Sequence, residues 1–236
     1  MTSPTSRLAA TLLLGARVAA NRIGVRSASV IGGGAIIFCA IAAWAERYAD
    51  SRTALNLALY GPTFGLAIPA ASLVLVSVAL SRSRLDYAVE CISLLGANRR
   101  TAALGALLAT SGIAALAGSL TAAVTVLVAN ARWDAASLHD AITCAWIGAM
   151  TAGVYVFFFG AASTVGKRGG GRILAFIADW LLGPMVGAGA LVFPRSHALN
   201  LLGADPVLDL PQTSSYAILL ALVLVYAAAA ALRTGR

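Results

Sequence analysis

Few side chains in this sequence have the type and spacing needed for acid–base, nucleophilic or metal chemistry. The only histidines are His139 and His197, and both fall in segments that we expect to be solvated loops. Two remote histidines do not supply the clustered ligands of a metal site. Ser111 has no histidine in its own apolar run to activate it as a nucleophile. We therefore expect no catalytic residue, no cofactor site and no metal site in this chain.

A basic, glycine-rich stretch at residues 167–172 superficially resembles a phosphate-binding loop. It reads KRGGGR and lacks the Gly-Lys-Ser/Thr order of such loops. It also joins two apolar runs, with no strand pattern before it. We interpret it as a flexible basic turn near anionic lipid headgroups.

Asp179 is the one formal charge inside a long apolar run. An acid within a membrane is costly and often functional. It lies six residues after Ile173, which is about 9 Å along a helix. We expect Asp179 to reach the membrane interface or to pair with a nearby arginine, with a role in transport or proton transfer as the alternative.

The most ordered pattern of charges and apolar residues lies at 82–100. Arg82, Asp86 and Glu90 have the i, i+4, i+8 spacing of one helix face with ionic support. A separate apolar face is formed by Leu85, Val89, Ile92 and Leu95. Gly96 can end the helix. The pattern predicts one short amphipathic helix over 85–97, which either rests at the membrane surface without a partner or docks into a cleft on a soluble protein.

Composition places these residues in a membrane protein. The chain has 236 residues, of which 60% are hydrophobic and 11% charged, and its mean hydropathy is +0.86. A soluble domain carries about 25% charged residues. This excludes an ordinary globular enzyme, a disordered chain and a DNA-binding domain. The net charge of +8 therefore indicates a membrane surface rather than a nucleic acid.

Six apolar runs are long enough to cross a bilayer, which takes roughly 17–25 helical residues. They are residues 27–45, 57–81, 101–131, 141–166, 173–194 and 210–232. Such runs show no period-two alternation, so they predict helices rather than a barrel. The fold class is therefore all-α, with six transmembrane helices. The third run could break near Gly112 or Gly118.

The basic residues indicate an orientation. Thirteen of the 17 basic residues lie before the first apolar run or after the second, fourth or sixth run. The other four lie after the first, third or fifth run. By the positive-inside rule both termini are cytoplasmic. The thirteen are Arg7, Arg17, Arg22, Arg26, Arg82, Arg84, Arg99, Arg100, Lys167, Arg168, Arg172, Arg233 and Arg236. Residues 1–26 predict a basic amphipathic helix on the cytoplasmic leaflet, with a basic tail as the alternative. Residues 27–236 form the six-span domain.

The segment 82–100 resembles the coupling helix of permease subunits in type-2 ABC transporters. In that family an acidic residue precedes an apolar run that ends in two leucines, and two arginines follow. Glu90, Leu94–Leu95 and Arg99–Arg100 are similar. The family also has a basic amphipathic helix before the first span and a longer outside segment before the last, as at 193–211 here.

The resemblance implies a permease subunit of an ATP-driven exporter in the inner membrane of a bacterium. It implies a dimer that forms the substrate path, and separate cytoplasmic ATPase subunits that hold ATP and Mg²⁺. The residues implied to contact the ATPase are Leu85, Asp86, Val89, Glu90, Ile92, Leu94, Leu95, Arg99 and Arg100. The expected partners are the ATPases, a second permease subunit and membrane lipids, with no nucleic acid. Two alternatives are a six-span scaffold or assembly protein and a proton-coupled transporter that uses Asp179.

Overall fold

The computed structural model describes residues 4–47, 51–130, 134–185, 187–205 and 207–234. All regular secondary structure within these residues is helical, so the predicted all-α class is confirmed. Five helices are long and apolar enough to cross a membrane: Thr5–Glu46, Thr53–Ala79, Arg99–Ala129, Ala135–Ala162 and Gln212–Thr234. They support a membrane protein.

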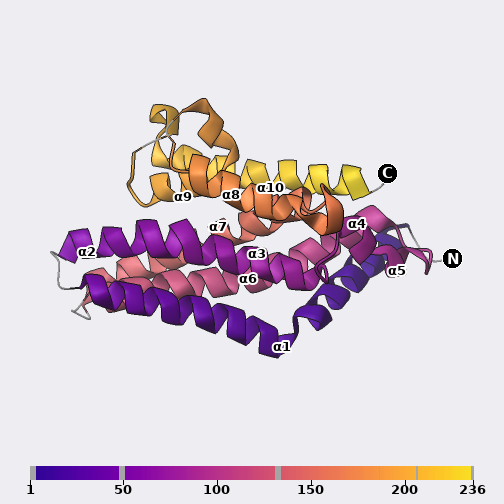
Figure 1. Ribbon diagram of the computed structural model, residues 1–236, viewed down its shortest axis with the longest axis horizontal. Helices are drawn as coiled ribbons and strands as arrows, with labels where there is room; N and C mark the ends of the chain where they lie inside the picture. Colours follow the sequence, from indigo (N-terminus) through magenta and orange to yellow (C-terminus); the bar gives the residue numbers. More distant parts are fainter. Residues whose placement is uncertain (1–3, 48–50, 131–133, 186, 206, 235–236) are drawn as a thin grey trace.

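The first helix, α1 (Pro4–Glu46), is a long rod with one sharp bend (Figure 1). The bend is at Gly24, which has φ 60° and ψ 160°. Glycine tolerates this positive φ because it lacks a Cβ atom. The bend lies close to the predicted boundary at residue 26. The part before it packs closely on α6 (Arg99–Ala129), since a Cβ atom on Gly15 would lie 2.1 Å from the carbonyl oxygen of Ala102.

The second path across the bundle consists of α2 (Ser51–Ala58), the π-helix η1 (Leu59–Ala67) and α3 (Ile68–Ala79). Pro62 lies inside η1 and has no N–H to donate to the carbonyl of Ala58, four residues earlier. The Thr63 hydroxyl donates to that carbonyl instead, at 2.8 Å. The wider turn therefore accommodates the proline without interrupting the helical path.

Two long helices, α6 and α7 (Ala135–Ala162), form the centre of the bundle. The Asn98 side chain caps the start of α6, and Asp134 caps the start of α7. The two helices touch at Gly118 and Gly148, where a Cβ atom on either would lie within 2.6 Å of the other's carbonyl oxygen. A break in α6 at Gly112 or Gly118 was one of the alternatives from sequence, and α6 is instead one continuous helix.

The fifth apolar run departs from its expected form. The sequence predicts one helix over 173–194, whereas α8 (Gly171–Leu182) ends before Pro184. Twelve residues span about 18 Å, less than the roughly 30 Å of a hydrocarbon core. Proline has no N–H to continue the helix. Four further elements follow: η3 (Ala188–Val192), α9 (Pro194–Leu201), η4 (Val207–Asp209) and α10 (Gln212–Thr234).

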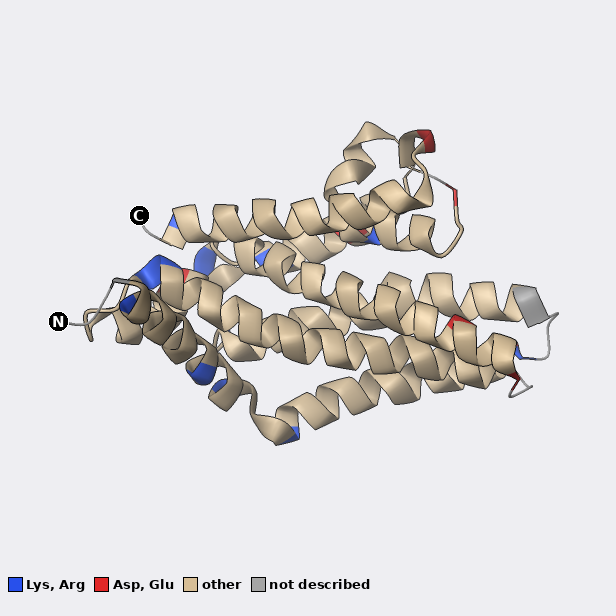
Figure 2. Cartoon of the chain, turned by 180° about the vertical axis from the view of Figure 1, so that it is seen from behind, with Lys and Arg blue, Asp and Glu red and all other residues tan. Residues whose placement is uncertain are grey.

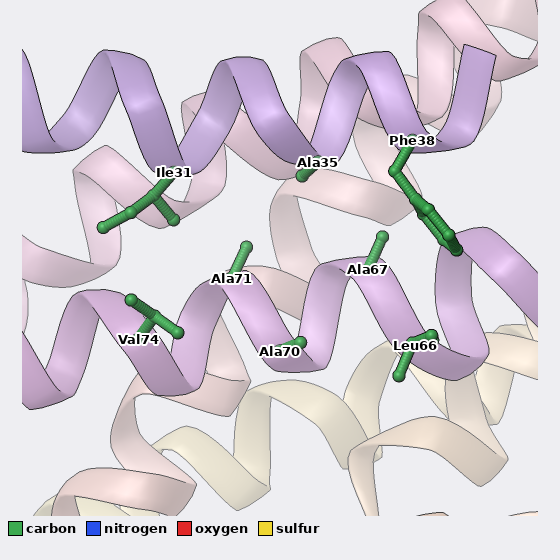
Figure 3. A pocket seen from close by; sticks show the side chains of 8 residues that line it. All are labelled: Ile31, Ala35, Phe38, Leu66, Ala67, Ala70, Ala71 and Val74. Carbon is green, nitrogen blue, oxygen red and sulfur yellow. The ribbon is translucent and has the colours of Figure 1, made fainter. Parts of the chain in front are cut away.

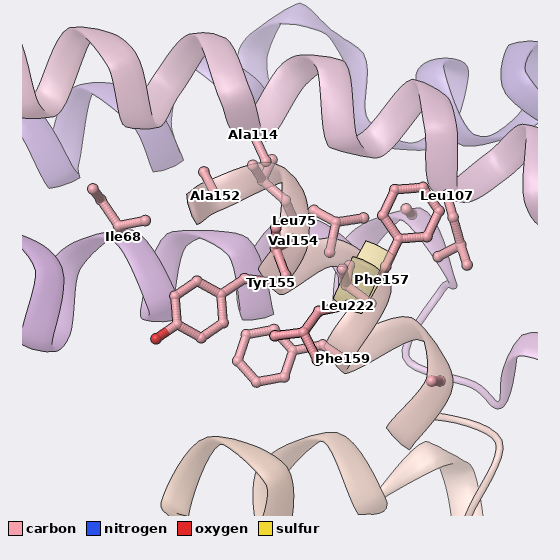
Figure 4. Packing of buried hydrophobic residues seen from close by; sticks show 14 of the residues in the cluster. Ile68, Leu75, Leu107, Ala114, Ala152, Val154, Tyr155, Phe157, Phe159 and Leu222 are labelled. Carbon is pink, nitrogen blue, oxygen red and sulfur yellow. The ribbon is translucent and has the colours of Figure 1, made fainter. Parts of the chain in front are cut away.

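The hydrophobic core surrounds the second half of α7. Every residue of this helix from Thr151 to Phe157 is buried, as expected for a helix enclosed on all sides. Figure 4 shows Tyr155, Phe157 and Phe159 of α7 among side chains of neighbouring helices. The rings of Tyr155 and Phe159 stack with centroids 5.5 Å apart. This core fixes the positions of α8, α9 and α10 relative to α7.

Both chain ends lie at one end of the bundle, together with α4 (Leu85–Ala88) and α5 (Glu90–Ser93) (Figure 1). Figure 2 shows most lysines and arginines at this end and most acids at the other. We call the end that holds Arg84, Arg99 and Arg233 the basic end, and the opposite end the far end.

Candidate functional site

The basic end carries a compact platform, which we define as residues 83–100 together with 163–172. The two stretches touch at Ser83. Its carbonyl oxygen accepts a hydrogen bond from Nη1 of Arg172 at 3.4 Å, and a Cβ atom on Gly169 would lie 2.8 Å from it. Arg172 is 5% exposed and also donates to the carbonyl of Arg168. The guanidinium thus fastens the start of α8 to the segment before α4.

The predicted single helix over 85–97 is wrong. The structure has two short helices, α4 and α5, which are separated at Val89 (φ −106°, ψ 4°). Leu85, Val89 and Ile92 are buried, as their spacing predicts. Leu95 is not on that buried face, because the helix ends at Ser93 and the chain then turns back through Gly96, which has φ 82°.

The turn after α5 exposes two leucines. Leu94 is 80% exposed and Leu95 is 79% exposed, although Ile92 in the helix before them is buried. Exposed apolar side chains with a polar rim are a mark of an interaction site. The rim includes Glu90, whose carboxylate lies 3.5 Å from Arg99. The sequence pattern placed these residues near one another, but only the turn directs both leucines outward.

The charged pairs differ from the predicted ones. The i, i+4, i+8 spacing predicts mutual support among Arg82, Asp86 and Glu90, but Arg82 lies in a turn with φ 56°. Asp86 pairs with Arg84 at 3.0 Å instead. Both ion pairs of the platform are partly exposed, so each contributes at most about 1 kcal/mol. Arg100 is exposed at the first turn of α6.

A pocket of about 460 Å³ opens between the two stretches of the platform. It is lined by Arg84, Tyr87, Gly166, Lys167 and Arg168. The Arg84 guanidinium carbon lies 5.7 Å from the centre of the Tyr87 ring, which is a cation–π distance. Tyr87 is 61% exposed. The platform therefore presents two surface features: the exposed leucines Leu94 and Leu95, and a pocket lined by basic residues and Tyr87.

Asp179 lies inside the molecule. It is 1% exposed, and its Oδ2 accepts a hydrogen bond from the Tyr155 hydroxyl at 2.6 Å. Its Oδ1 accepts from the backbone N–H of Arg195 at 3.4 Å. The carboxylate is therefore enclosed by the protein rather than exposed at its surface. The expected arginine is present, but its backbone rather than its guanidinium makes the hydrogen bond.

The side chain of Arg195 connects three elements at the far end. Its Nη1 donates to the carbonyl of Trp180 on α8 at 3.1 Å. Its Nη2 lies against η1, since a Cβ atom on Gly65 would be 2.7 Å away. Its Nε is buried and has no hydrogen-bond partner among the described residues. Neither Tyr155 nor Arg195 stands out in the sequence, because their partners are distant along the chain.

His197 is fully buried, so its prediction as a solvated loop residue is wrong. In α9 its Nε2 lies 3.0 Å from the carbonyl oxygen of Leu191, and its Nδ1 lies 3.3 Å from the Ser215 hydroxyl. Asn200 donates to the same hydroxyl at 2.9 Å. His139 lies exposed on the first turns of α7.

No group of three or more His, Cys, Asp or Glu side chains in the described ranges is placed to hold a metal ion. Comparison of the chain with models of protein families, with curated proteins and with solved structures gave no match.

Proposed function

We propose that this chain is the permease subunit of an ATP-driven ABC exporter in the inner membrane of a bacterium. In this proposal two permease subunits form the substrate path, and separate cytoplasmic ATPase subunits dock on the platform. The chain itself hydrolyses no ATP. The observation that carries the proposal is the exposure of Leu94 and Leu95 on a surface that is anchored to the membrane helices.

The anchoring of the platform suits a coupling element. Leu85, Val89 and Ile92 belong to the same hydrophobic core as α6 and α7. Arg172 ties the platform to the start of α8. A push on Leu94 and Leu95 is therefore delivered to packed helices rather than absorbed by a loose loop. A closely packed protein interior transmits a displacement from one element to the next.

The path of the chain supports six crossings. Both chain ends lie at the basic end (Figure 1), which requires an even number of crossings. Five long helices account for five. In the proposal α8 and the short elements α9 and η4 that follow it together complete the sixth crossing before α10 begins. The basic end then faces the cytoplasm by the positive-inside rule.

Two exposed apolar faces support a dimer. On α1, Val30, Ile37 and Ile41 are each more than 60% exposed. On α8, Leu174 is 69% exposed and Trp180 is 53% exposed. We propose that α1 and α8 meet a second permease subunit, because the described residues leave these two apolar faces uncovered.

Purification of the chain from its native membrane in mild detergent tests the function directly. The expected result is a co-purifying soluble chain with a phosphate-binding loop and ATPase activity. If the folded chain is recovered from its native membrane without any ATPase, the proposal is contradicted.

The buried Asp179 is the observation that favours proton-coupled transport instead. The two functions differ in their energy source. Substrate movement in inside-out vesicles that needs ATP and persists without a pH gradient supports the ABC permease. Movement driven by a pH gradient without ATP, and lost in Asp179→Asn, supports the alternative.

A further inference from the structure

An apolar groove runs between α1 and the path formed by the end of η1 and the first turns of α3 (Figure 3). Its volume is about 400 Å³. Ile31, Ala35 and Phe38 line it from α1, and residues between Leu66 and Val74 line it from the other side. Figure 3 shows Phe38 and Leu66 at one end and Ile31 and Val74 at the other. All the lining side chains are hydrocarbon, so water in the groove would find no hydrogen-bond partner among them.

The groove exists because small residues face α1. Ala67, Ala70 and Ala71 are too short to reach across to the opposing helix. The space left between two helices that already contact each other is narrower than a further helix, which is about 10 Å across with its side chains. An occupant must therefore be a thin, flexible and apolar chain.

One end of the groove leads toward Arg22, and a second arginine, Arg26, lies on another face of α1. Nη1 of Arg22 donates to the carbonyl of Ala79 at 3.2 Å, and Ala79 lies five residues, about 7.5 Å, beyond Val74 along α3. Arg26 lies five residues before Ile31, about 140° around the helix from it, and is exposed. The bend at Gly24 lies between the two arginines. Within the described chain neither guanidinium has a carboxylate partner within 4.0 Å.

We infer that this groove binds one acyl chain of an anionic bilayer phospholipid, with the lipid phosphate at Arg22. The hydrocarbon slot matches the acyl chain, and the cation beyond its end matches the charge of the headgroup. Arg22 is already oriented by Ala79, and its remaining N–H groups are available to a phosphate. This site does not depend on the proposed exporter function, because it uses neither the platform nor an ATPase.

The experiment is native mass spectrometry of the full-length protein. The protein is reconstituted in vesicles of equal parts palmitoyl-oleoyl phosphatidylglycerol and phosphatidylcholine and is then released into mild detergent. We expect the wild type to retain one phospholipid, enriched in phosphatidylglycerol. Ala71→Phe fills the groove and should remove the retained lipid. Ala217→Phe, on an exposed face of α10, is the matched control and should keep it.

The arginine variants test the headgroup part of the site. Arg22→Gln should lower the preference for phosphatidylglycerol about fivefold, the factor that corresponds to one basic residue near an anionic surface. Arg17→Gln changes an exposed arginine on the same helix and should leave the preference unchanged. Circular dichroism checks the fold of each variant, and Ala70→Phe is a second filling variant if Ala71→Phe is misfolded.

Three outcomes overturn the inference. The first is a wild type that carries no lipid after this treatment. The second is equal lipid retention in the wild type and in the correctly folded filling variants. The third is an unchanged headgroup preference in Arg22→Gln. A filling variant that loses a second protein copy, rather than a lipid, assigns the groove to a protein interface instead.

Discussion

The Tyr155 hydroxyl donates a 2.6 Å hydrogen bond to Oδ2 of Asp179, and this bond joins the central helix α7 to α8 inside the molecule. Both side chains are buried. A buried carboxylate is costly unless it is hydrogen-bonded. The bond therefore holds the short helix α8 at a fixed position against the core.

We expect Tyr155→Phe to lower the free energy of unfolding by roughly 1–3 kcal/mol, because it removes a donor from a buried acceptor. In an Asp179→Leu background the same change should cost less, since the acceptor is gone. Thermal unfolding in detergent micelles measures the four proteins of this cycle. Tyr216→Phe is the control, because the Tyr216 hydroxyl has no hydrogen-bond partner among the described residues. Equal losses in both backgrounds would show that the two side chains are not coupled.

Two identical substitutions on α6 should have opposite effects. A Cβ atom on Gly118 would lie 2.6 Å from the carbonyl oxygen of Gly148, so Gly118→Ala should destabilise the protein by roughly 1–3 kcal/mol. A Cβ atom on Gly112 meets nothing within 4 Å. Gly112→Ala should therefore be neutral or should stabilise the helix by up to about 1 kcal/mol. Thermal midpoints of both variants check this, and a destabilised Gly112→Ala is the contrary result.

The platform prediction concerns ATPase binding. Glu90→Lys reverses a charge that could pair with a basic residue of the ATPase, a contact of about 1.5–3 kcal/mol. Leu94→Asp removes an apolar contact of about the same size. Each should lower ATPase retention in membranes at least about tenfold and reduce transport, while the protein remains inserted.

The far end supplies matched controls for this test. Asp205→Lys reverses an exposed charge, and Leu208→Asp changes a leucine that is 46% exposed. Both should retain the ATPase. If Glu90→Lys and Leu94→Asp bind the ATPase as well as these controls do, residues 85–97 are not the coupling segment.

The proposed orientation places Ser93 in the cytoplasm and Asp205 outside. In intact cells a membrane-impermeant maleimide should label Asp205→Cys and should not label Ser93→Cys or the native Cys91, which is exposed at the basic end. Inside-out vesicles should give the reverse. Permeabilised cells, in which every exposed cysteine reacts, provide the control. Labelling of Ser93→Cys but not Asp205→Cys in intact cells refutes the orientation.

The proposed dimer predicts proximity of α1 and α8 from two subunits. Single cysteines at Val30 on α1 and Ile177 on α8, both exposed, should form cross-linked dimers in native membranes. Leu224→Cys on the exposed face of α10 should give few. Monomers alone at all three positions count against a shared substrate path.

Several features followed from local sequence. Long apolar runs bounded by charges predict α6, α7 and α10. This prediction needs only the hydropathy of consecutive residues and no knowledge of which residues meet in space. The turn at Gly96 also follows from sequence, since glycine readily adopts the positive φ found there. Pro184 is likewise a local signal for a helix end. The length of the 22-residue apolar run nevertheless favoured one continuous helix, and the sequence did not show that the proline would end it.

The sequence by itself determined that this chain is an all-helical membrane protein with its basic residues gathered toward both chain ends and two of the connections. Only the tertiary structure decided that Leu94 and Leu95 face outward, that His197 is buried, and that Asp179 is bound to Tyr155. The partners of His197 and Asp179 are 18 and 24 residues away along the chain. Their meeting depends on how α7, α8, α9 and α10 pack, which is a property of pairs of helices and not of any one segment.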